Sequence, residues 1–137
     1  MSLIFQKPIR LSPKSQGFHL ITKDIFKEIP ELPENGIMHL FIKHTSAGLT
    51  LNENASPDVR YDFHNFIQKL IPESFPDFLH TLEGPDDMPA HIKASLIGQT
   101  VTIPIINKQM ALGTWQGIYL GEFRKNAGPR EIIISIY

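Results

Sequence analysis

The chain has 137 residues, of which 42% are hydrophobic and 20% are charged, and its formal net charge is −1. This length and hydrophobic fraction are typical of one domain with its own core, residues 1–137, and the near-neutral charge argues against a broad basic surface for nucleic acid. The absence of cysteine excludes disulfides and thiolate metal sites, so any metal must be bound by nitrogen and oxygen.

The N-terminal residues include Gln6 and Lys7 before an apolar stretch of signal-peptide length can form. No apolar run approaches the length that spans a bilayer. We therefore expect a cytoplasmic protein with no membrane contact.

Short apolar runs, separated by eleven prolines and nine glycines, predict a fold with many strands. In chain order, we expect strands at 3–11 and 18–21, a short helix at 23–29, and strands at 36–44 and 49–53. The strand at 36–44 is apolar on both faces, which predicts that both faces are covered.

The clearest helix begins after Ser56, which is expected to cap it, with Pro57 and Asp58 in its first turn. Its apolar residues fall at helical spacing and form one face, and Pro72 ends it; they are Val59, Phe63, Phe66, Ile67 and Leu70. A second short helix is expected at 89–96, with Asp86 or Asp87 as its cap and Gly98 just past its end.

The rest of the chain is expected to be β, with strands at 100–106, 112–123 and 131–137 joined by turns. These three strands should form an antiparallel meander. The whole pattern predicts an α+β, strand-rich fold in which antiparallel sheets pack as a sandwich or flattened barrel, with two to three short helices.

Two histidines and several acidic residues lie close together between His80 and His91. Imidazole and carboxylate ligands suit Zn, Mn or Fe, and the turn at Gly84 and Pro85 can bring the two rings together. The spacing matches no standard zinc motif. The alternative is that an aspartate caps the helix and both histidines are ordinary surface residues.

A second polar segment begins where the strand at 36–44 ends, with His44 followed by Thr45 and Ser46. Such a turn can offer backbone N–H groups and hydroxyls to a phosphate. Asn52 and Glu53 then occupy a strand that normally disfavours them. This indicates either an exposed edge or a functional role.

The third polar segment interrupts an apolar strand with Thr114, Trp115 and Gln116. Trp115 can stack on a flat heteroaromatic ring, although a single tryptophan in a strand is more often part of a core or an interface. Arg130 can clamp a phosphate through its guanidinium. The alternative for Arg130 is a surface ion pair with a nearby glutamate, Glu122 or Glu131, which would contribute little.

Together the three segments resemble the YjbQ family, also called the secondary thiamine-phosphate synthase enzyme family. The resemblance rests on the segments that begin His44-Thr-Ser-Ala-Gly-Leu-Thr-Leu-Asn-Glu, Glu83-Gly-Pro-Asp-Asp-Met-Pro-Ala-His and Leu112-Gly-Thr-Trp-Gln-Gly-Ile-Tyr. It covers nearly the whole chain, although Pro85 and Asp86 differ from the Gly-Asn pair of many members. The resemblance implies a compact β-rich α+β fold, a homotrimer and a divalent metal, preferably Zn²⁺, at the histidines.

With the residues above, the resemblance predicts three sets of site residues. The metal ligands would be His44, His80, Asp87 and His91; the catalytic residues His44, Glu53 and Arg130; and the substrate-binding residues Thr45, Ser46, Asn52, Thr114, Trp115 and Gln116. The substrate would be a small phosphorylated metabolite.

The family name implies the joining of hydroxymethylpyrimidine diphosphate to thiazole phosphate, for which Mg²⁺ is the alternative ion. Arg130 and the amides of residues 45–48 would hold phosphate oxygens, and Trp115 would stack on the pyrimidine. His44 or His91 would be a ligand or general acid, and Glu53 a base. Two alternatives stay open: a metal-dependent hydrolase or metabolite-repair enzyme, and a non-catalytic protein that binds a metal or a phosphometabolite.

Overall fold

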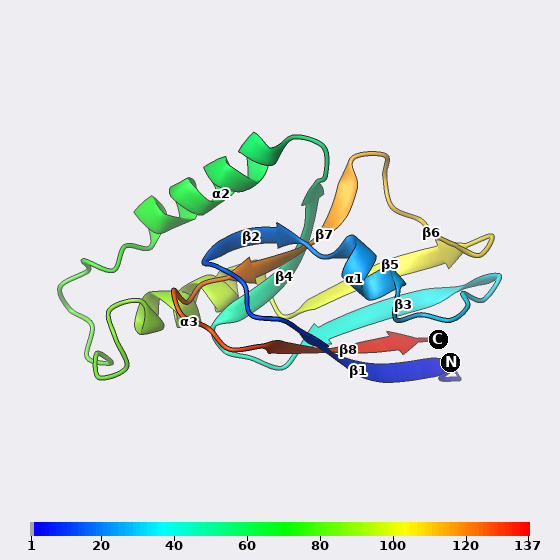
Figure 1. Cartoon of the computed structure of the whole chain (residues 1–137), viewed down its shortest axis with the longest axis horizontal. Helices are drawn as coiled ribbons and strands as arrows, with labels where there is room; N and C mark the ends of the chain where they lie inside the picture. Colours follow the sequence, from blue (N-terminus) through cyan, green and yellow to red (C-terminus); the bar gives the residue numbers. More distant parts are fainter. Residues whose placement is uncertain (1) are drawn as a thin grey trace.

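The computed structural model describes residues 2–137 and shows two antiparallel sheets with three helices packed against them (Figure 1). The strands are β1 (Phe5–Leu11), β2 (Gly17–Leu20), β3 (Asn35–Ile42), β4 (Ala47–Glu53), β5 (Thr100–Ile106), β6 (Gln109–Met110), β7 (Gln116–Glu122) and β8 (Arg130–Ile136). The helices are α1 (Thr22–Phe26), α2 (Pro57–Leu70) and α3 (Asp87–Ile97). The expected strand-rich α+β fold is confirmed. Within residues 2–137, no helix is long and apolar enough to cross a membrane.

The larger sheet has the strand order β1-β8-β3-β5-β6, and the smaller sheet has the order β2-β7-β4. The expected meander of the last three long strands is therefore wrong. β5 pairs with β3, β8 lies between β1 and β3, and β7 belongs to the other sheet. The connections before and after β7 cross between the sheets, so strands adjacent in sequence line opposite sides of one core.

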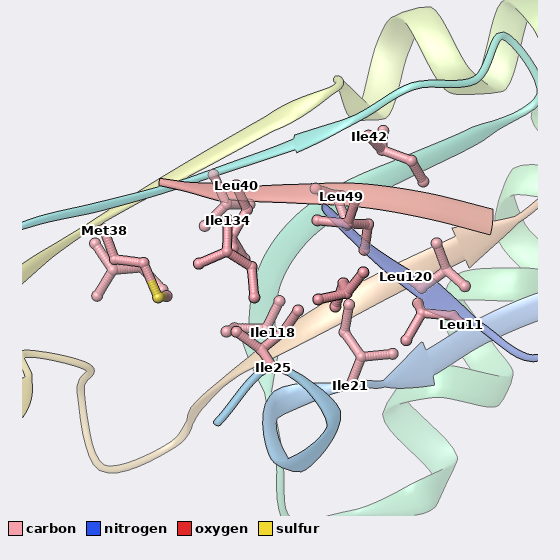
Figure 2. Close-up of a cluster of buried hydrophobic side chains, with 14 of the residues drawn as sticks. Leu11, Ile21, Ile25, Met38, Leu40, Ile42, Leu49, Ile118, Leu120 and Ile134 are labelled. Carbon is pink, nitrogen blue, oxygen red and sulfur yellow. The ribbon is translucent and has the colours of Figure 1, made fainter. Parts of the chain in front are cut away.

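The main core fills the space between the two sheets (Figure 2). Alternate residues of β3, β5 and β8 supply one side, and residues of β4 and β7 supply the other: Met38, Leu40, Ile42, Ile103, Ile105, Ile132, Ile134 and Ile136 pack with Leu49, Ile118 and Leu120. β3 is buried on only one face, because Phe41 on its outer face is exposed. The expectation that both faces of this strand are covered is wrong.

A smaller apolar cluster joins α2 and α3 to the small sheet, so β7 is buried on both faces. Tyr119 lies in this cluster, with Phe63 and Ile67 of α2 packed against it. Phe66 and Leu70 remain exposed. The apolar face expected for α2 is thus only partly buried, because the helix contacts the sheet through the side that carries Phe63 and Ile67.

α3 begins at Asp87, two residues earlier than expected, and ends before Gly98, whose φ of 105° is in the left-handed region. Neither Ser56 nor Asp86 makes a side-chain capping bond. β4 passes close to the end of α3, where the N–H of Leu49 donates to Gly98 O at 2.9 Å. This contact fixes the helix against the small sheet.

Candidate metal centre

Four side chains, those of His80, Glu83, Asp87 and His91, each bring one potential ligand atom to within 4.8 Å of the others. The loop before α3 supplies His80 and Glu83. The first two turns of α3 supply Asp87 and His91, whose i,i+4 spacing places both on one side of the helix. Asp87 Oδ2 lies 2.8 Å from His80 Nε2 and 3.0 Å from His91 Nε2, and Glu83 Oε2 lies 3.1 Å from His80 Nε2.

The tautomer of His91 follows from its other ring nitrogen, which lies 2.9 Å from the carbonyl oxygen of Thr45. A carbonyl only accepts, so Nδ1 carries a proton, and whenever the ring is neutral its Nε2 presents a lone pair to Asp87. A lone pair 3.0 Å from a carboxylate oxygen is repulsive unless a proton or a metal ion lies at that position. Histidine ligands of metals commonly donate their other N–H to a carbonyl in this way.

The donor set fits a divalent transition metal. Two imidazoles with carboxylate oxygens are established ligands of Zn²⁺, whose tetrahedral bonds of about 2.0–2.1 Å place ligand atoms about 3.3–3.4 Å apart. The contacts of 2.8–3.1 Å here are only a few tenths of an ångström shorter than that. The Asp87 side chain is 3% exposed and that of Glu83 is 63% exposed. The cluster is therefore anchored on its inner side and open to solvent on its outer side.

The charges in the cluster shift its pKa values in the directions expected of paired acids and bases. The hydrogen bond to Asp87 is the main cause of a raised pKa at His80. Burial acts to raise the pKa of Asp87, but the contacts with His80 and Glu83 and the charges of His91 and Arg124 outweigh it, and the net pKa is lowered. Asp87 thus stays a carboxylate near neutral pH, the form that binds metal ions.

Arg124 lies in the connection between β7 and β8 and contacts the cluster from its buried side. Its Nη1 donates to Asp87 Oδ1, and its Nε donates to Asp86 Oδ2 at 2.9 Å. Its Nη2 donates to the carbonyl oxygen of Glu83 at 2.9 Å. Asp86 Oδ2 also accepts from the N–H of Lys125 at 2.9 Å. One guanidinium therefore ties the loop and both aspartates to the small sheet.

From Arg124 the hydrogen bonds continue into the sheets. The N–H of Arg124 donates to Glu122 Oε2 at 3.1 Å, and Arg130 donates to both oxygens of Glu122 at 2.7 and 2.6 Å. Arg130 Nη2 also donates to Ser46 Oγ at 2.9 Å. Ser46 follows Thr45, whose carbonyl oxygen holds His91. A continuous chain of contacts therefore links Asp87, through Arg124 and the buried Arg130–Glu122 ion pair, to the segment that binds His91.

His44 lies outside the four-residue cluster. Its Nε2 accepts a 2.8 Å hydrogen bond from the N–H of Glu131, so Nδ1 carries the proton of the neutral ring. Burial, followed by the charge of Arg130, lowers the pKa of His44. A ring in this state has no free lone pair for a metal ion. Arg130 was expected to bind a phosphate. It is buried instead, and its Nε and Nη2 donate to the two carboxylate oxygens of Glu122.

Asn52 and Glu53 lie at the far end of β4. Six residue steps of about 3.3 Å, or about 20 Å in all, separate Glu53 from Ala47 at the near end. Asn52 Oδ1 accepts from the N–H of Glu53 at 2.8 Å, and the Glu53 carboxylate accepts from the N–H of Ser56 at 3.1 Å. Both side chains therefore make local contacts.

Residues 113–116 form a turn, and β7 begins at Gln116 rather than at residue 112. Gln116 Oε1 accepts from the N–H of Gly113 at 2.8 Å, and Trp115 O accepts from the N–H of Asn54 at 2.8 Å. Thr114 and Trp115 are exposed, Trp115 by 63%. The predicted site residues thus fall into two groups at opposite ends of β4 and β7. One group lies in or near the four-residue cluster: His44, Thr45, Ser46, His80, Asp87, His91 and Arg130. The other group lies far from the cluster: Asn52, Glu53, Thr114, Trp115 and Gln116.

Two residues of the candidate centre, Glu83 and Arg124, were not predicted from the sequence. A signal for Glu83 was present, because it lies between His80 and Asp87 in a segment dense in side chains that can bind metal ions. No such signal exists for Arg124, whose partners lie 37 to 41 residues away in the sequence.

The fold and the cluster define a strand-rich α+β protein with a candidate histidine–carboxylate centre. Residues 7–137 match the family model described as UPF0047 protein YjbQ-like. The proteins named UPF0047 protein YjbQ from Escherichia coli O157:H7 and Salmonella typhimurium are 44% and 47% identical over 134 residues, 96% of each chain. A crystal structure of a YjbQ/UPF0047 family protein from Clostridium acetobutylicum matches with a TM-score of 0.82 at 37% identity, covering 96% of this chain and 99% of that one. The chain belongs to the YjbQ/UPF0047 family.

Proposed function

We propose that this chain is a metal-dependent enzyme that hydrolyses a small phosphorylated metabolite at the centre formed by His80, Glu83, Asp87 and His91. The observation that carries the proposal is the convergence of four ligand atoms within 4.8 Å around one buried carboxylate, with an open outer side. Catalytic zinc sites typically have three protein ligands and keep one position open. A divalent ion at such a site supplies Lewis acidity and makes water a better nucleophile near neutral pH.

The four side chains divide into ligands and a base. His80, Asp87 and His91 would hold the ion, preferably Zn²⁺, because two imidazoles suit Zn²⁺ better than Mg²⁺. Glu83 is the most exposed of the four, and its Oε2 would accept the proton of the attacking water. A surface hollow of about 330 Å³ beside the cluster, lined by Thr45, His91, Ser95 and Gln99, offers hydroxyl and amide groups to the substrate.

The same contacts favour hydrolysis over the joining of hydroxymethylpyrimidine diphosphate to thiazole phosphate. A synthase must hold the departing diphosphate with cationic groups. Two arginines near the cluster already have anionic partners, Arg124 with Asp87 and Arg130 with Glu122. The open outer side also favours catalysis over binding alone, since purely structural zinc sites are closed by four protein ligands.

The test combines metal analysis with turnover of a panel of phosphate esters. We expect the wild-type chain to bind one equivalent of Zn²⁺, Asp87→Asn to lose it, and Glu83→Gln to keep the metal but lose turnover. His39→Gln is the matched control, because His39 lies on the outer face of β3 and contacts Thr102 instead. A wild-type chain that takes up no Zn²⁺, Co²⁺ or Mn²⁺ would contradict the metal centre. Formation of thiamine phosphate from the two substrates, lost in Asp87→Asn, would favour the synthase over the hydrolase.

We also propose the homotrimer that the resemblance implies. Apolar side chains beside the cluster support an assembly: Leu79 and Leu82, on either side of His80, are 97% and 100% exposed, and exposed apolar groups of this kind often mark interfaces. A neighbouring copy on this surface would cover them and narrow the open side of the centre.

Light scattering on purified protein tests the assembly. We expect the mass of a trimer for the wild-type chain and a smaller mass for the double variant Leu79→Ser/Leu82→Ser. The control is Leu3→Ser/Ile4→Ser, which removes exposed apolar groups beside β1 and should leave the trimer intact. A monomeric wild-type chain contradicts the proposal.

A further inference from the structure

We propose that Arg124 is a positioning residue that restricts Asp87 to binding the metal through one oxygen and thereby sets the metal preference of the centre. The inference rests on the proposed metal centre and assigns a role to a residue that contacts none of the candidate ligand nitrogens. It follows from the different partners of the two Asp87 oxygens.

The Asp87 carboxylate has a separate task at each oxygen. Oδ1 accepts from Arg124 Nη1, whereas Oδ2 faces Nε2 of His80 and Nε2 of His91. The side chain is 3% exposed, so its oxygens find their partners within the protein rather than in solvent. Binding a metal through both oxygens would require Oδ1 to leave the guanidinium.

Arg124 cannot easily move away to permit this, because it is fixed at three further points. Its Nε donates to Asp86, its Nη2 donates to Glu83 O, and its own N–H donates to Glu122. Asp86 is itself fixed, because its Oδ2 also accepts from the N–H of Lys125 at 2.9 Å. The guanidinium is therefore held in place independently of Asp87.

The number of carboxylate oxygens available decides which ions the centre accommodates well. A carboxylate that binds through one oxygen fills one coordination position, which suits four-coordinate Zn²⁺ or Co²⁺. Mn²⁺ and Ca²⁺ take six or more ligands, and bidentate carboxylates help to supply them. With Oδ1 held by Arg124, the centre should discriminate in favour of Zn²⁺ and against Mn²⁺.

The experiment compares the affinities of Zn²⁺ and Mn²⁺, measured by competition with a chelator, in wild-type protein, Arg124→Gln and Arg124→Lys. We expect Zn²⁺ affinity to fall about 10- to 100-fold in both variants, as for other residues that orient a metal ligand, and the Zn²⁺:Mn²⁺ affinity ratio to fall at least about tenfold. Lysine keeps the charge but cannot hold Asp86, Asp87 and Glu83 O together. Loss in Arg124→Lys therefore supports orientation rather than charge.

Lys125→Gln is the matched control, since it removes one positive charge from the next residue, whose side chain pairs with Glu73. This variant should keep the wild-type affinities. The visible spectrum of the Co²⁺-loaded protein gives a second readout: the wild-type spectrum should be that of four-coordinate Co²⁺, and the Arg124 variants should shift toward higher coordination.

Arg124 variants with a wild-type Zn²⁺:Mn²⁺ ratio and Co²⁺ spectrum would overturn this assignment alone. If they do not fold, Asp86→Asn weakens one anchor of Arg124 while leaving Asp87 in place, and the same fall in ratio is expected, to a smaller extent. An unchanged ratio in Asp86→Asn would then overturn the assignment. A wild-type chain that binds neither ion would overturn the proposed function as well.

Discussion

Polar residues are frequent at both ends of the β4–β7 pair, but the hydrogen bonds of their side chains differ. At the end near Ser46, side chains bridge distant parts of the sequence, as Arg130 does when it donates to Ser46 Oγ from 84 residues away. At the other end, the side chains of Asn52, Glu53 and Gln116 accept from backbone N–H groups only one to three residues away. Polar density in a sequence thus marks two kinds of structure, a locally stabilised turn and a site assembled from separate elements.

Burial also separates the two ends. Glu122, Arg130 and Asp87 are buried, so breaking one of their contacts leaves a charge away from water. Trp115 is exposed, so water replaces whatever its side chain loses. This difference predicts a ranking of mutational effects that can be measured one variant at a time.

The largest effect is expected from Glu122→Gln. The variant leaves the Arg130 guanidinium buried without its counter-charge, and removing one partner of such a pair typically costs about 3–5 kcal/mol of unfolding free energy. Urea denaturation measures the change. Glu131→Gln is the control, because Glu131 forms an exposed pair with Lys43 at 3.6 Å and should lose at most about 1 kcal/mol. Equal losses in the two variants would show that the buried pair does not hold the near end together.

A smaller loss is expected from Tyr119→Phe, which affects the far end. The buried Tyr119 hydroxyl donates to the carbonyl oxygen of Glu53, and deleting one such bond costs about 1 kcal/mol. Tyr61→Phe on the exposed side of α2 is the control and should be neutral in the same urea assay. A loss in Tyr119→Phe as large as that in Glu122→Gln would remove the energetic difference between the two ends.

His44 should make stability depend on pH in one direction. Its pKa is lowered in the folded chain, first by burial and then by Arg130, so below about pH 6.5, the ordinary value, the unfolded chain binds more protons. Stability therefore falls as the pH drops from there through the lowered pKa, and His44→Gln should reduce this fall. Urea denaturation at pH 7.5 and at lower pH, with NMR titration of His44, tests this. A pKa of His44 above 6.5 would contradict it, and His39→Gln should retain the wild-type pH dependence.

The smallest effect is expected from Trp115→Ala. Its side chain is 63% exposed and its polar contact uses the backbone oxygen, so unfolding free energy should change by no more than about 0.5 kcal/mol. Metal content should equal that of the wild-type chain. Loss of metal would contradict the separation of the two ends. Loss of turnover at full stability and metal content would instead support the substrate-binding role that the resemblance implies for Trp115.

Local patterns in the sequence predicted the elements well, but not their arrangement. The alternation in β5 and the glycine after α3 are local signals, and both have the expected structural consequence. The position of β7 between β2 and β4 is not local, because it depends on which apolar faces meet across the core. α3 begins at Asp87 rather than at residue 89, so Asp87 and His91 lie on one helical face. The expected boundary left Asp87 outside the helix and therefore did not predict this.

The candidate site shows the same division. His80 and His91 were candidate ligands by residue type and proximity, because they lie within twelve residues of chain, whereas Asp87 was assigned as a ligand only through the resemblance. Arg124 was not predicted, because nothing near it in sequence indicates that it meets Asp87. The expected role of Arg130 reflects the same limit: the sequence offered Glu122 and Glu131 as partners for a surface ion pair, and only the fold selects Glu122 and buries the pair.

β4 passes so close to the end of α3 at Gly48 that this position should not tolerate a larger residue. A Cβ at this position would lie 2.8 Å from Gly98 O and 3.1 Å from Ile97 Cγ2, so even alanine would force the backbone apart. The displaced helix carries His91, whose acceptor Thr45 lies on the strand side. In a saturation screen for loss of function, Gly48 should therefore group with the ligand residues, although it has no polar side chain and touches none of them.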